Sequence, residues 1–202
     1  MAKKIILALI IIIVFIISFA FLMINNSNTV DVFIDGENIT VETNSIEGTN
    51  LKKFNEDVCN LTINVMNNPA SNITTLKNGI NDLCKDYGLK NPEINVDSII
   101  GTDQIPVMIH VDGTSMLPTL QDGQTIIINK THDIKVGDIV VAESDEYGGI
   151  IKRVGNIKGN SVYLISDNKN ISYEYINGNI YQIKGITTWV DMSDINGVAI
   201  EY

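Results

Sequence analysis

A serine in a turn flanked by glycine and proline is the residue of this sequence best placed for covalent chemistry. Ser115 lies in the segment GTSMLPTL, residues 113–120. The glycine allows backbone conformations that other residues avoid, and Pro118 restricts the chain shortly after the serine. In such a turn the Ser115 hydroxyl and its own backbone N–H can both face a substrate carbonyl. Most serines in turns of this kind are only turn residues, so the segment alone does not identify a nucleophile.

A lysine in an apolar strand is the second group of interest. Lys152 lies in the run GIIKRV, residues 149–154. Because side chains alternate between the faces of a strand, Lys152 shares a face with Ile150 and Val154. One interpretation is a solvated edge strand, or an ammonium group that extends past its apolar neighbours. The other is that burial lowers the lysine pKa by up to about 3 to 5 units, so that the neutral amine acts as a general base for serine.

Four segments, in this order, resemble one enzyme family. They are GTSMLPTL at 113–120, KVGDIV at 135–140, IKRV at 151–154 and SDNKNISYE at 166–174. Together they resemble the signal peptidase I family of Ser/Lys-dyad serine peptidases, which is related to the self-cleaving phage and SOS repressors. The resemblance covers about residues 106–175. It implies a coiled antiparallel β catalytic domain and a membrane-anchored serine endopeptidase that cleaves signal peptides from exported precursor proteins.

The resemblance also implies roles for individual residues. Ser115 matches the family nucleophile and Lys152 matches its general base. Ser172 matches the serine that orients the lysine amine. The backbone N–H of Ser115 is then one oxyanion donor, and Gly113 stands where some members add a serine hydroxyl. No cofactor and no metal ion are expected.

The same segments predict a substrate cleft and show departures from the family. Met116 matches a residue that flanks the cleft, and shallow subsites for small substrate residues are expected near Met116 and Ile109. Asp167 matches a structural acidic position. Ser166 and Glu174 stand where the family has glycine and aspartate. The nucleophile also lies about 90 residues beyond the apolar N-terminal segment, whereas the family usually places the two close together.

Short apolar runs separated by turns make up the sequence from residue 105 onward. Turn residues such as Asp122-Gly123 and Asn177-Gly178 supply the conformations that tight connections need. No helical pattern interrupts the runs, so we expect a mainly β, largely antiparallel peptidase domain over residues 105–202. The expected strands are 107–111, 125–129, 138–143, 149–154, 161–166, 171–176, 179–190 and 197–202.

The preceding region, residues 27–104, has a different composition. Between Asn25 and Asn95 lie 16 of the 24 asparagines. Apolar residues recur at helical spacing over residues 51–65 and again over 73–87, on either side of a break at Asn67-Asn68-Pro69. This spacing predicts a helical hairpin within a small extracytoplasmic region.

An uncharged apolar stretch occupies residues 5–24. At about 1.5 Å per residue it covers roughly 30 Å, the thickness of the hydrocarbon core of a bilayer. Lysines at 3–4 precede it and the next basic residue is Lys52, so the positive-inside rule places the N-terminus in the cytoplasm and the rest of the chain outside. The alternative is a cleaved secretory peptide ending at the small-x-small triplet 18–20. The apolar run continues past that triplet, which favours a retained single-pass anchor over residues 1–26 in the cell membrane.

The only two cysteines, Cys59 and Cys84, fall in the two expected helices. In an oxidising compartment they are a candidate structural disulfide, which would need an offset register between antiparallel helices. Two cysteines without a nearby histidine are half of a tetrahedral set, so they do not suggest a metal site. Six Asn-x-Ser/Thr sequons permit an extracytoplasmic location without establishing it.

Charge limits the partners that the chain can have. Outside the N-terminal segment, 12 basic residues stand against 24 acidic ones, so a polyphosphate would be repelled and nucleic acid is not an expected partner. The expected partners are precursor proteins with signal peptides and the lipid bilayer.

Other functions remain compatible with the same residues. One is a specialised peptidase for a single pilin-like, surface or phage-related protein. A repressor-like autoprotease would need an Ala-Gly or Cys-Gly type bond, and the sequence contains neither dipeptide. A non-catalytic envelope module with a decayed site is opposed by the intact Ser115 and Lys152.

Overall fold

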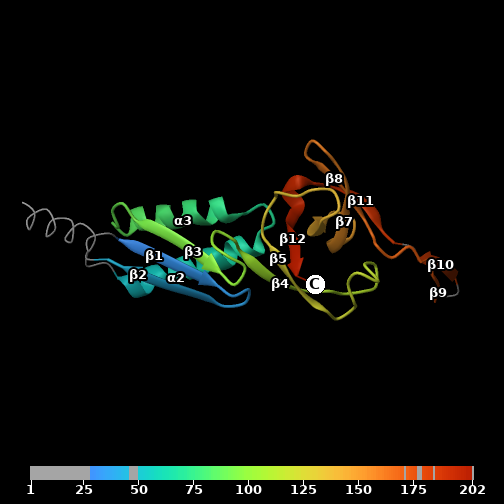
Figure 1. Ribbon diagram of the computed structural model, residues 1–202, viewed down its shortest axis with the longest axis horizontal. Helices are drawn as coiled ribbons and strands as arrows, with labels where there is room; N and C mark the ends of the chain where they lie inside the picture. The colour runs from blue at the N-terminus through green and yellow to red at the C-terminus, as the bar shows by residue number, and fades with distance from the viewer. Residues whose placement is uncertain (1–27, 46–49, 171, 177–178, 184, 202) are drawn as a thin grey trace, which may run out of the picture.

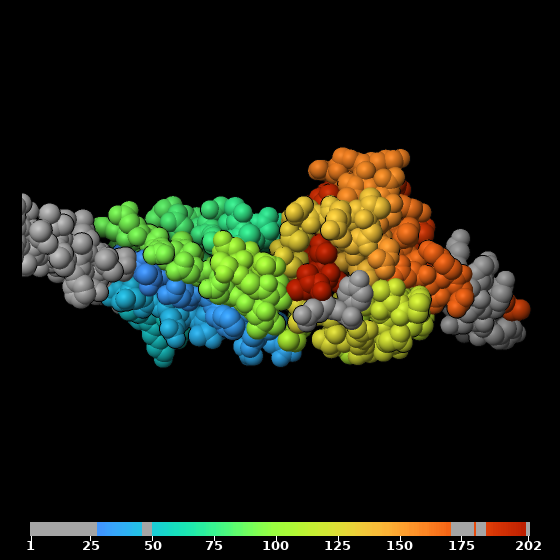
Figure 2. Space-filling view, viewed as in Figure 1, coloured from blue at the N-terminus to red at the C-terminus, as the bar shows by residue number. Residues whose placement is uncertain are grey.

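The computed structural model describes the chain as two units, an α/β unit over residues 28–98 and a β domain over residues 106–201 (Figures 1 and 2). The expected anchor, residues 1–26, lies outside the described residues. Within the described part, no helix is both long and apolar enough to cross a membrane. The described ranges are 28–45, 50–170, 172–176, 179–183 and 185–201.

A three-stranded sheet forms one layer of the α/β unit. Its strands are β1 (Thr29–Ile34), β2 (Ile39–Asn44) and β3 (Glu93–Ser98), in the order β2-β1-β3. β1 pairs antiparallel with β2 and parallel with β3. A parallel pair needs a long crossover connection, which here contains two helices. The sequence pattern predicts only the helices in this region, and the sheet corrects that expectation.

Two helices form the second layer. They are α2 (Leu51–Asn67) and α3 (Ile73–Asp86), and they lie where the apolar spacing predicts them. Asn72 caps α3 by accepting hydrogen bonds from the backbone N–H groups of Thr74 and Thr75. α2 ends just before Asn68-Pro69, where proline prevents the helix from continuing.

A single hydrophobic core joins the helices to one face of this sheet. Alternate β1 residues point into it, whereas Asp31 and Phe33 lie on the opposite, exposed face. Full burial of one large aliphatic or aromatic side chain contributes about 1.5–3 kcal/mol, so this core stabilises the unit substantially. Its largest fully buried side chains include Ile34, Phe54, Leu76 and Ile80.

Cys59 and Cys84 are both free cysteines, so the candidate disulfide between them is not formed. The helices are held in register where Leu61 packs on Gly79, whose added Cβ would lie only 2.8 Å from Leu61 Cδ2. In an antiparallel pair with that register, Cys84 is level with Glu56. Cys59 then lies about 4.5 Å away along the axis. It is also about 200° around the helix from Leu61, so it points away from α3. Cys84 is instead buried in the core, while Cys59 is partly exposed.

Thiol labelling is expected to distinguish the two cysteines. In the folded protein without reductant, Cys59 should react with a maleimide at least about tenfold faster than Cys84, because burial excludes the reagent from Cys84 and raises the pKa of its thiol. Timed alkylation followed by peptide mass spectrometry measures both rates, and a Cys59→Ser variant isolates the slower one. Failure of both thiols to react in denaturant until reductant is added would show a disulfide and contradict this arrangement.

A seven-stranded antiparallel sheet forms most of the β domain. It curls around itself, with β11 and β4 as its two edge strands in the order β11-β8-β7-β6-β12-β5-β4 (Figure 1). The mainly β, curled antiparallel architecture expected from the sequence is therefore confirmed. The strands are β4 (Pro106–His110), β5 (Thr125–Asn129), β6 (Ile139–Ser144), β7 (Gly148–Lys158), β8 (Ser161–Ile165), β11 (Thr187–Asp191) and β12 (Ile195–Glu201), with a short 3₁₀ helix, η1 (Met192–Asp194), before β12.

The expected strand 179–190 is in fact two strands. β10 (Asn179–Ile183) pairs with β9 (Ser172–Ile176) in a separate two-stranded sheet, whereas β11 belongs to the large sheet. The division falls near Gly185, where an added Cβ would lie 2.7 Å from Ser166 Cβ and 2.8 Å from the Asn168 carbonyl oxygen. Glycine allows the backbone to pass this close, at the point where the chain leaves the small sheet for the large one.

Candidate active site

Ser115 lies in the loop that connects β4 to β5. Gly113 precedes it with a φ of +90°, a conformation that favours glycine, and the Gly113 N–H donates to Asp122 Oδ1 at 2.8 Å. On the other side of the serine, Met116 is buried in a core shared with β5 and β6. The loop is thus held on both sides of Ser115, and the serine itself lines a cleft.

Lys152 lies in β7, which runs between β6 and β8 inside the sheet. Its alternate neighbours Ile150 and Val154 are buried, and Lys152 itself is only 4% exposed. The strand alternation expected from the sequence is confirmed. The two solvated interpretations, an edge strand and an ammonium group that reaches water, are wrong because the strand is internal and the side chain is enclosed.

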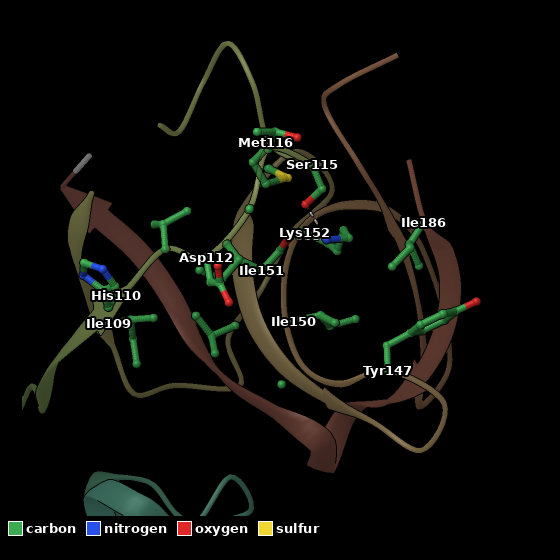
Figure 3. A pocket seen from close by; sticks show the side chains of 15 residues that line it. Ile109, His110, Asp112, Ser115, Met116, Tyr147, Ile150, Ile151, Lys152 and Ile186 are labelled. Carbon is green, nitrogen blue, oxygen red and sulfur yellow. Dashed lines mark hydrogen bonds between the residues drawn. The ribbon is translucent and has the colours of Figure 1, made fainter. Parts of the chain in front are cut away.

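The two side chains meet. Lys152 Nζ donates to Ser115 Oγ at 2.8 Å and to the Ile151 carbonyl oxygen at 2.9 Å (Figure 3). Burial lowers the pKa of Lys152, because desolvation penalises the ammonium form. Once neutral, the amine can accept the hydroxyl proton of Ser115 and still donate to the carbonyl. This geometry is that of a nucleophile beside its general base.

The backbone around Ser115 also suits an anionic intermediate. Among the described residues, no acceptor takes a hydrogen bond from the Ser115 N–H. The Gly113 N–H, in contrast, is used by Asp122. Gly113 therefore supports the site through its backbone conformation, and the Ser115 N–H is the donor left to face a developing oxyanion.

A cleft of about 500 Å³ opens in front of the pair (Figure 3). Ile109 and Met116, the two residues expected from the sequence, both line it. Tyr147, from the β6–β7 turn, and Ile186, just before β11, line it as well, and no local pattern in the sequence indicates them. The lining is mainly apolar, and the volume lies in the ordinary range of ligand-binding clefts.

An ion pair near the site joins three segments of the chain. Arg153 lies on the opposite face of β7 from Lys152 and donates to Asp167 through Nε at 2.7 Å and Nη2 at 2.5 Å. Thr119 Oγ1 donates to the same carboxylate at 2.6 Å, which ties the Ser115 loop to β7. The Arg153 hydrogen bond holds the pKa of Asp167 below its usual value. The sequence indicated a structural role for Asp167 but not its partners Arg153 and Thr119.

Asn168 is a second positioning residue, and no pattern in the sequence indicates its role. Its backbone N–H donates to the Ser115 carbonyl oxygen at 2.9 Å. Its side-chain Nδ2 donates to the Thr114 carbonyl oxygen, also at 2.9 Å. These bonds hold the Ser115 loop from the segment that follows β8. Asn168, in the segment SDNKNISYE, therefore acts on the site through the backbone of that loop.

The remaining expected residues lie at the two ends of that segment, residues 166–174. Ser166, in place of the family glycine, is buried, and its Oγ donates to the Ile186 carbonyl oxygen at 3.0 Å, so the structure accommodates the departure. Ser172 begins β9 opposite Ile183. The side chains of Ser172 and Glu174 lie outside the described residues, and the orienting role of Ser172 stays a prediction.

Replacing Asp167 with asparagine is expected to destabilise the protein by about 2 kcal/mol, because the partly buried Arg153 loses a charged partner. For a chain of this size the melting temperature should fall by roughly 4–8 °C. In the wild type, the lowered pKa of Asp167 means that this stabilisation is present above about pH 4 and is lost as the pH falls through the lower folded value. Thermal melts between about pH 3 and pH 7 measure both effects.

Asp82→Asn is the matched control for that variant. Asp82 pairs with Lys85 on the surface of α3, where both side chains are mostly exposed. Its removal should change stability by less than about 0.5 kcal/mol. Equal destabilisation by the two substitutions would contradict the role given to the Asp167 pair.

The part of the chain that carries this site is similar to known peptidases. A family model described as Peptidase S24-like matches residues 80–188, a span that includes Ser115, Lys152 and Asp167. The chain is also 35% identical over 79 residues to a signal peptidase I of Bacillus licheniformis, a match that covers 34% of this chain and 42% of that relative. The chain thus aligns with less than half of the relative's length. Because the family model covers more than half of the 202 residues, the chain belongs to the Peptidase S24-like family.

Proposed function

We propose that this protein is a membrane-anchored serine endopeptidase that removes signal peptides from exported precursors on the outer face of the membrane. One observation carries the catalytic part of the proposal: the buried Lys152 Nζ lies 2.8 Å from Ser115 Oγ beside an open cleft. The similarity to a signal peptidase I supports the substrate class. The apolar segment 5–24 and the lysines that precede it support the anchoring and the orientation.

The first half of the reaction transfers the acyl group to the enzyme. Ser115 Oγ attacks the scissile carbonyl carbon while Lys152 Nζ takes the hydroxyl proton. The negative charge that develops on the carbonyl oxygen faces the Ser115 N–H. Collapse of this intermediate breaks the C–N bond, and the leaving amine takes the proton from Lys152. The product is an ester between Ser115 and the signal peptide.

The second half releases the signal peptide. The neutral Lys152 amine takes a proton from a water molecule, whose oxygen attacks the ester carbonyl. The bond to Ser115 Oγ then breaks, and the proton held by Lys152 returns to the serine. Lys152 must therefore accept and return a proton twice in each cycle, which requires a pKa not far from the working pH. Its burial in β7 shifts the pKa in that direction.

Processing of a preprotein reporter tests this function. Membranes that contain the full-length protein should convert a signal-peptide reporter to its mature form, and N-terminal sequencing of the product should place the cut after a small residue. Membranes with the Ser115→Ala variant at equal protein level are the matched control. If wild-type and Ser115→Ala membranes process the reporter equally, the proposed function is wrong.

A further inference from the structure

The link between the two units is part of both hydrophobic cores. Ile105 is fully buried in the core of the α/β unit, and Val107 of β4 packs against the cores of both units. The Ile105 carbonyl oxygen accepts a hydrogen bond from Lys130 N at 2.9 Å, and its N–H donates to Asn129 Oδ1 at 3.3 Å. The connection is therefore packed and hydrogen-bonded rather than a free linker.

Two further contacts brace the units on either side of this link. The turn after β1 touches β4, since an added Cβ on Gly36 would lie 3.2 Å from Met108 Cγ. The loop between α2 and α3 touches the β domain, where His132 Nε2 lies 3.0 Å from the Pro69 carbonyl oxygen. Three separate contacts oppose bending, and the two units form one elongated body (Figure 2).

These contacts show which end of the α/β unit faces the β domain. β1 runs toward the Gly36 turn, and α2 runs toward the Pro69 loop. The six residues of β1 span about 20 Å and the 17 residues of α2 about 25 Å. Thr29, at the start of β1, therefore lies roughly 20 Å from the β domain, at the opposite end of the unit (Figure 1).

The chain enters the unit at that distant end. Asn28 is fixed there, because its Nδ2 donates to the Lys90 carbonyl oxygen at 2.7 Å and its own carbonyl oxygen accepts from Glu93 N at 2.8 Å. Residues 25–27 alone separate it from the apolar segment 5–24, and three residues reach at most about 10 Å. An anchor in that segment holds this end of the unit close to the bilayer.

Charge opposes a flat arrangement of the molecule on the bilayer. Residues 28–104 contain 12 acidic and 5 basic residues, and residues 105–202 contain 12 acidic and 7 basic ones. A surface of this sign is repelled by anionic head groups within about one Debye length, roughly 8 Å at physiological salt. With one end tethered, the acidic body extends away from the membrane, and the cleft stands beyond the α/β unit.

We propose that the α/β unit is a rigid spacer, and that it restricts this peptidase to membrane-bound precursors whose scissile bond stands at least about 20–25 Å from the bilayer. The proposal rests on the anchoring and peptidase activity proposed above. An extended substrate advances about 3.3 Å per residue, so at least about seven residues must separate its membrane segment from the bond. Precursors cut immediately beside the membrane segment are then poor substrates.

Reporters of graded length test the spacer. They share one membrane segment and one cleavage sequence, separated by Gly/Ser linkers of about 2 to 16 residues, and are reconstituted with the full-length enzyme in vesicles of mixed neutral and anionic phospholipid. Cleavage with linkers of about eight residues or more is expected to be at least about tenfold faster than with about two. The same reporters in detergent are the control, because enzyme and substrate are then not held in one bilayer, and the dependence on linker length should disappear.

The possible outcomes distinguish failure of the spacer proposal from failure of the proposed peptidase activity. If the shortest reporter is cleaved fastest in vesicles, the spacer proposal is wrong. It is also wrong if cleavage in detergent depends on linker length as strongly as it does in vesicles, because the dependence would then reflect only how accessible the bond is. If no reporter is cleaved faster than by Ser115→Ala, the proposed function fails instead.

A second measurement does not depend on catalysis. Trp189, in β11 of the β domain, is the only tryptophan, so its fluorescence reports how near that domain lies to the bilayer. Phospholipids brominated on their acyl chains should leave the emission within about 5% of its value in unbrominated vesicles, because quenching requires near contact with the bilayer. Strong quenching would place the β domain on the membrane and overturn the spacer.

Discussion

Ser115→Ala is expected to lower kcat/KM for a peptide substrate by at least about 10³-fold. The substitution removes the only hydroxyl within hydrogen-bond distance of Lys152 Nζ among the described residues, and with it the oxygen that forms the acyl-enzyme. The loop itself should persist, because it is held by Gly113, Asn168 and Met116 rather than by the serine side chain. Initial rates of the purified full-length enzyme, with thermal melts to confirm folding, measure the loss.

Ser161→Ala provides the matched control for this loss. Ser161 begins β8 and is exposed, away from the residues that line the active-site cleft. Its removal should leave kcat/KM within about twofold of the wild type, as expected for a surface substitution. Retention of wild-type activity by Ser115→Ala would contradict the nucleophile, and an equal loss in both variants would indicate a general effect on the protein.

The sequence predicted the two members of this pair for different reasons. Lys152 follows from strand alternation, a local property, and its enclosure on the Ile150 face confirms the pattern. The turn that contains Ser115 does not identify a nucleophile by itself. The serine stands out only when the four ordered segments are considered together. That the two side chains meet cannot be derived from spacing, because they are 37 positions apart in the chain and only the folding of the sheet brings them together.

The positioning contacts show where local patterns stop being informative. The Arg153–Asp167 pair and the Asn168 bonds to the nucleophile loop link segments that are far apart in the chain. No periodicity marks such contacts, since each depends on how β7, β8 and the loop after β4 are brought together. The position of Tyr147 in the cleft depends on the same long-range packing, and no local pattern indicates it.

The fold, like the site, has parts that local sequence patterns predict and parts that depend on long-range contacts. The α2 and α3 helices follow from apolar residues at helical spacing, and the antiparallel strands of the β domain follow from short runs between turns. The β1–β3 pair was missed although Val30, Val32 and Ile34 alternate correctly, because its partners are parallel and lie more than 60 residues apart. The break near Gly185, between β10 and β11, is explained by the close approach of Ser166 and Asn168, which no local pattern in the sequence indicates.

Lys152→Arg is expected to lower kcat/KM at neutral pH by at least about 10³-fold, because arginine keeps the positive charge but does not release its proton. Lys152→Met, which has a similar length and no charge, should be equally inactive, and it separates loss of the base from the effect of a buried guanidinium group. The matched control is Lys158→Arg. Lys158 is an exposed lysine of the same strand that lies over the Trp189 ring, and its substitution should change the rate by less than about twofold.

The pH dependence of the wild type tests the proton transfer itself. Burial disfavours the ammonium form of Lys152, so its pKa in the folded protein is lower than that of a free lysine, about 10.4. The neutral amine, which is the active form, should therefore accumulate as the pH rises through this lowered value. Accordingly, kcat/KM should increase with pH and level off before about pH 10, whereas the residual activity of Lys152→Arg should not follow that curve. A wild-type profile that still rises steeply at pH values near 10 would mean that the amine keeps an ordinary pKa, and the assignment of Lys152 as the general base would fail.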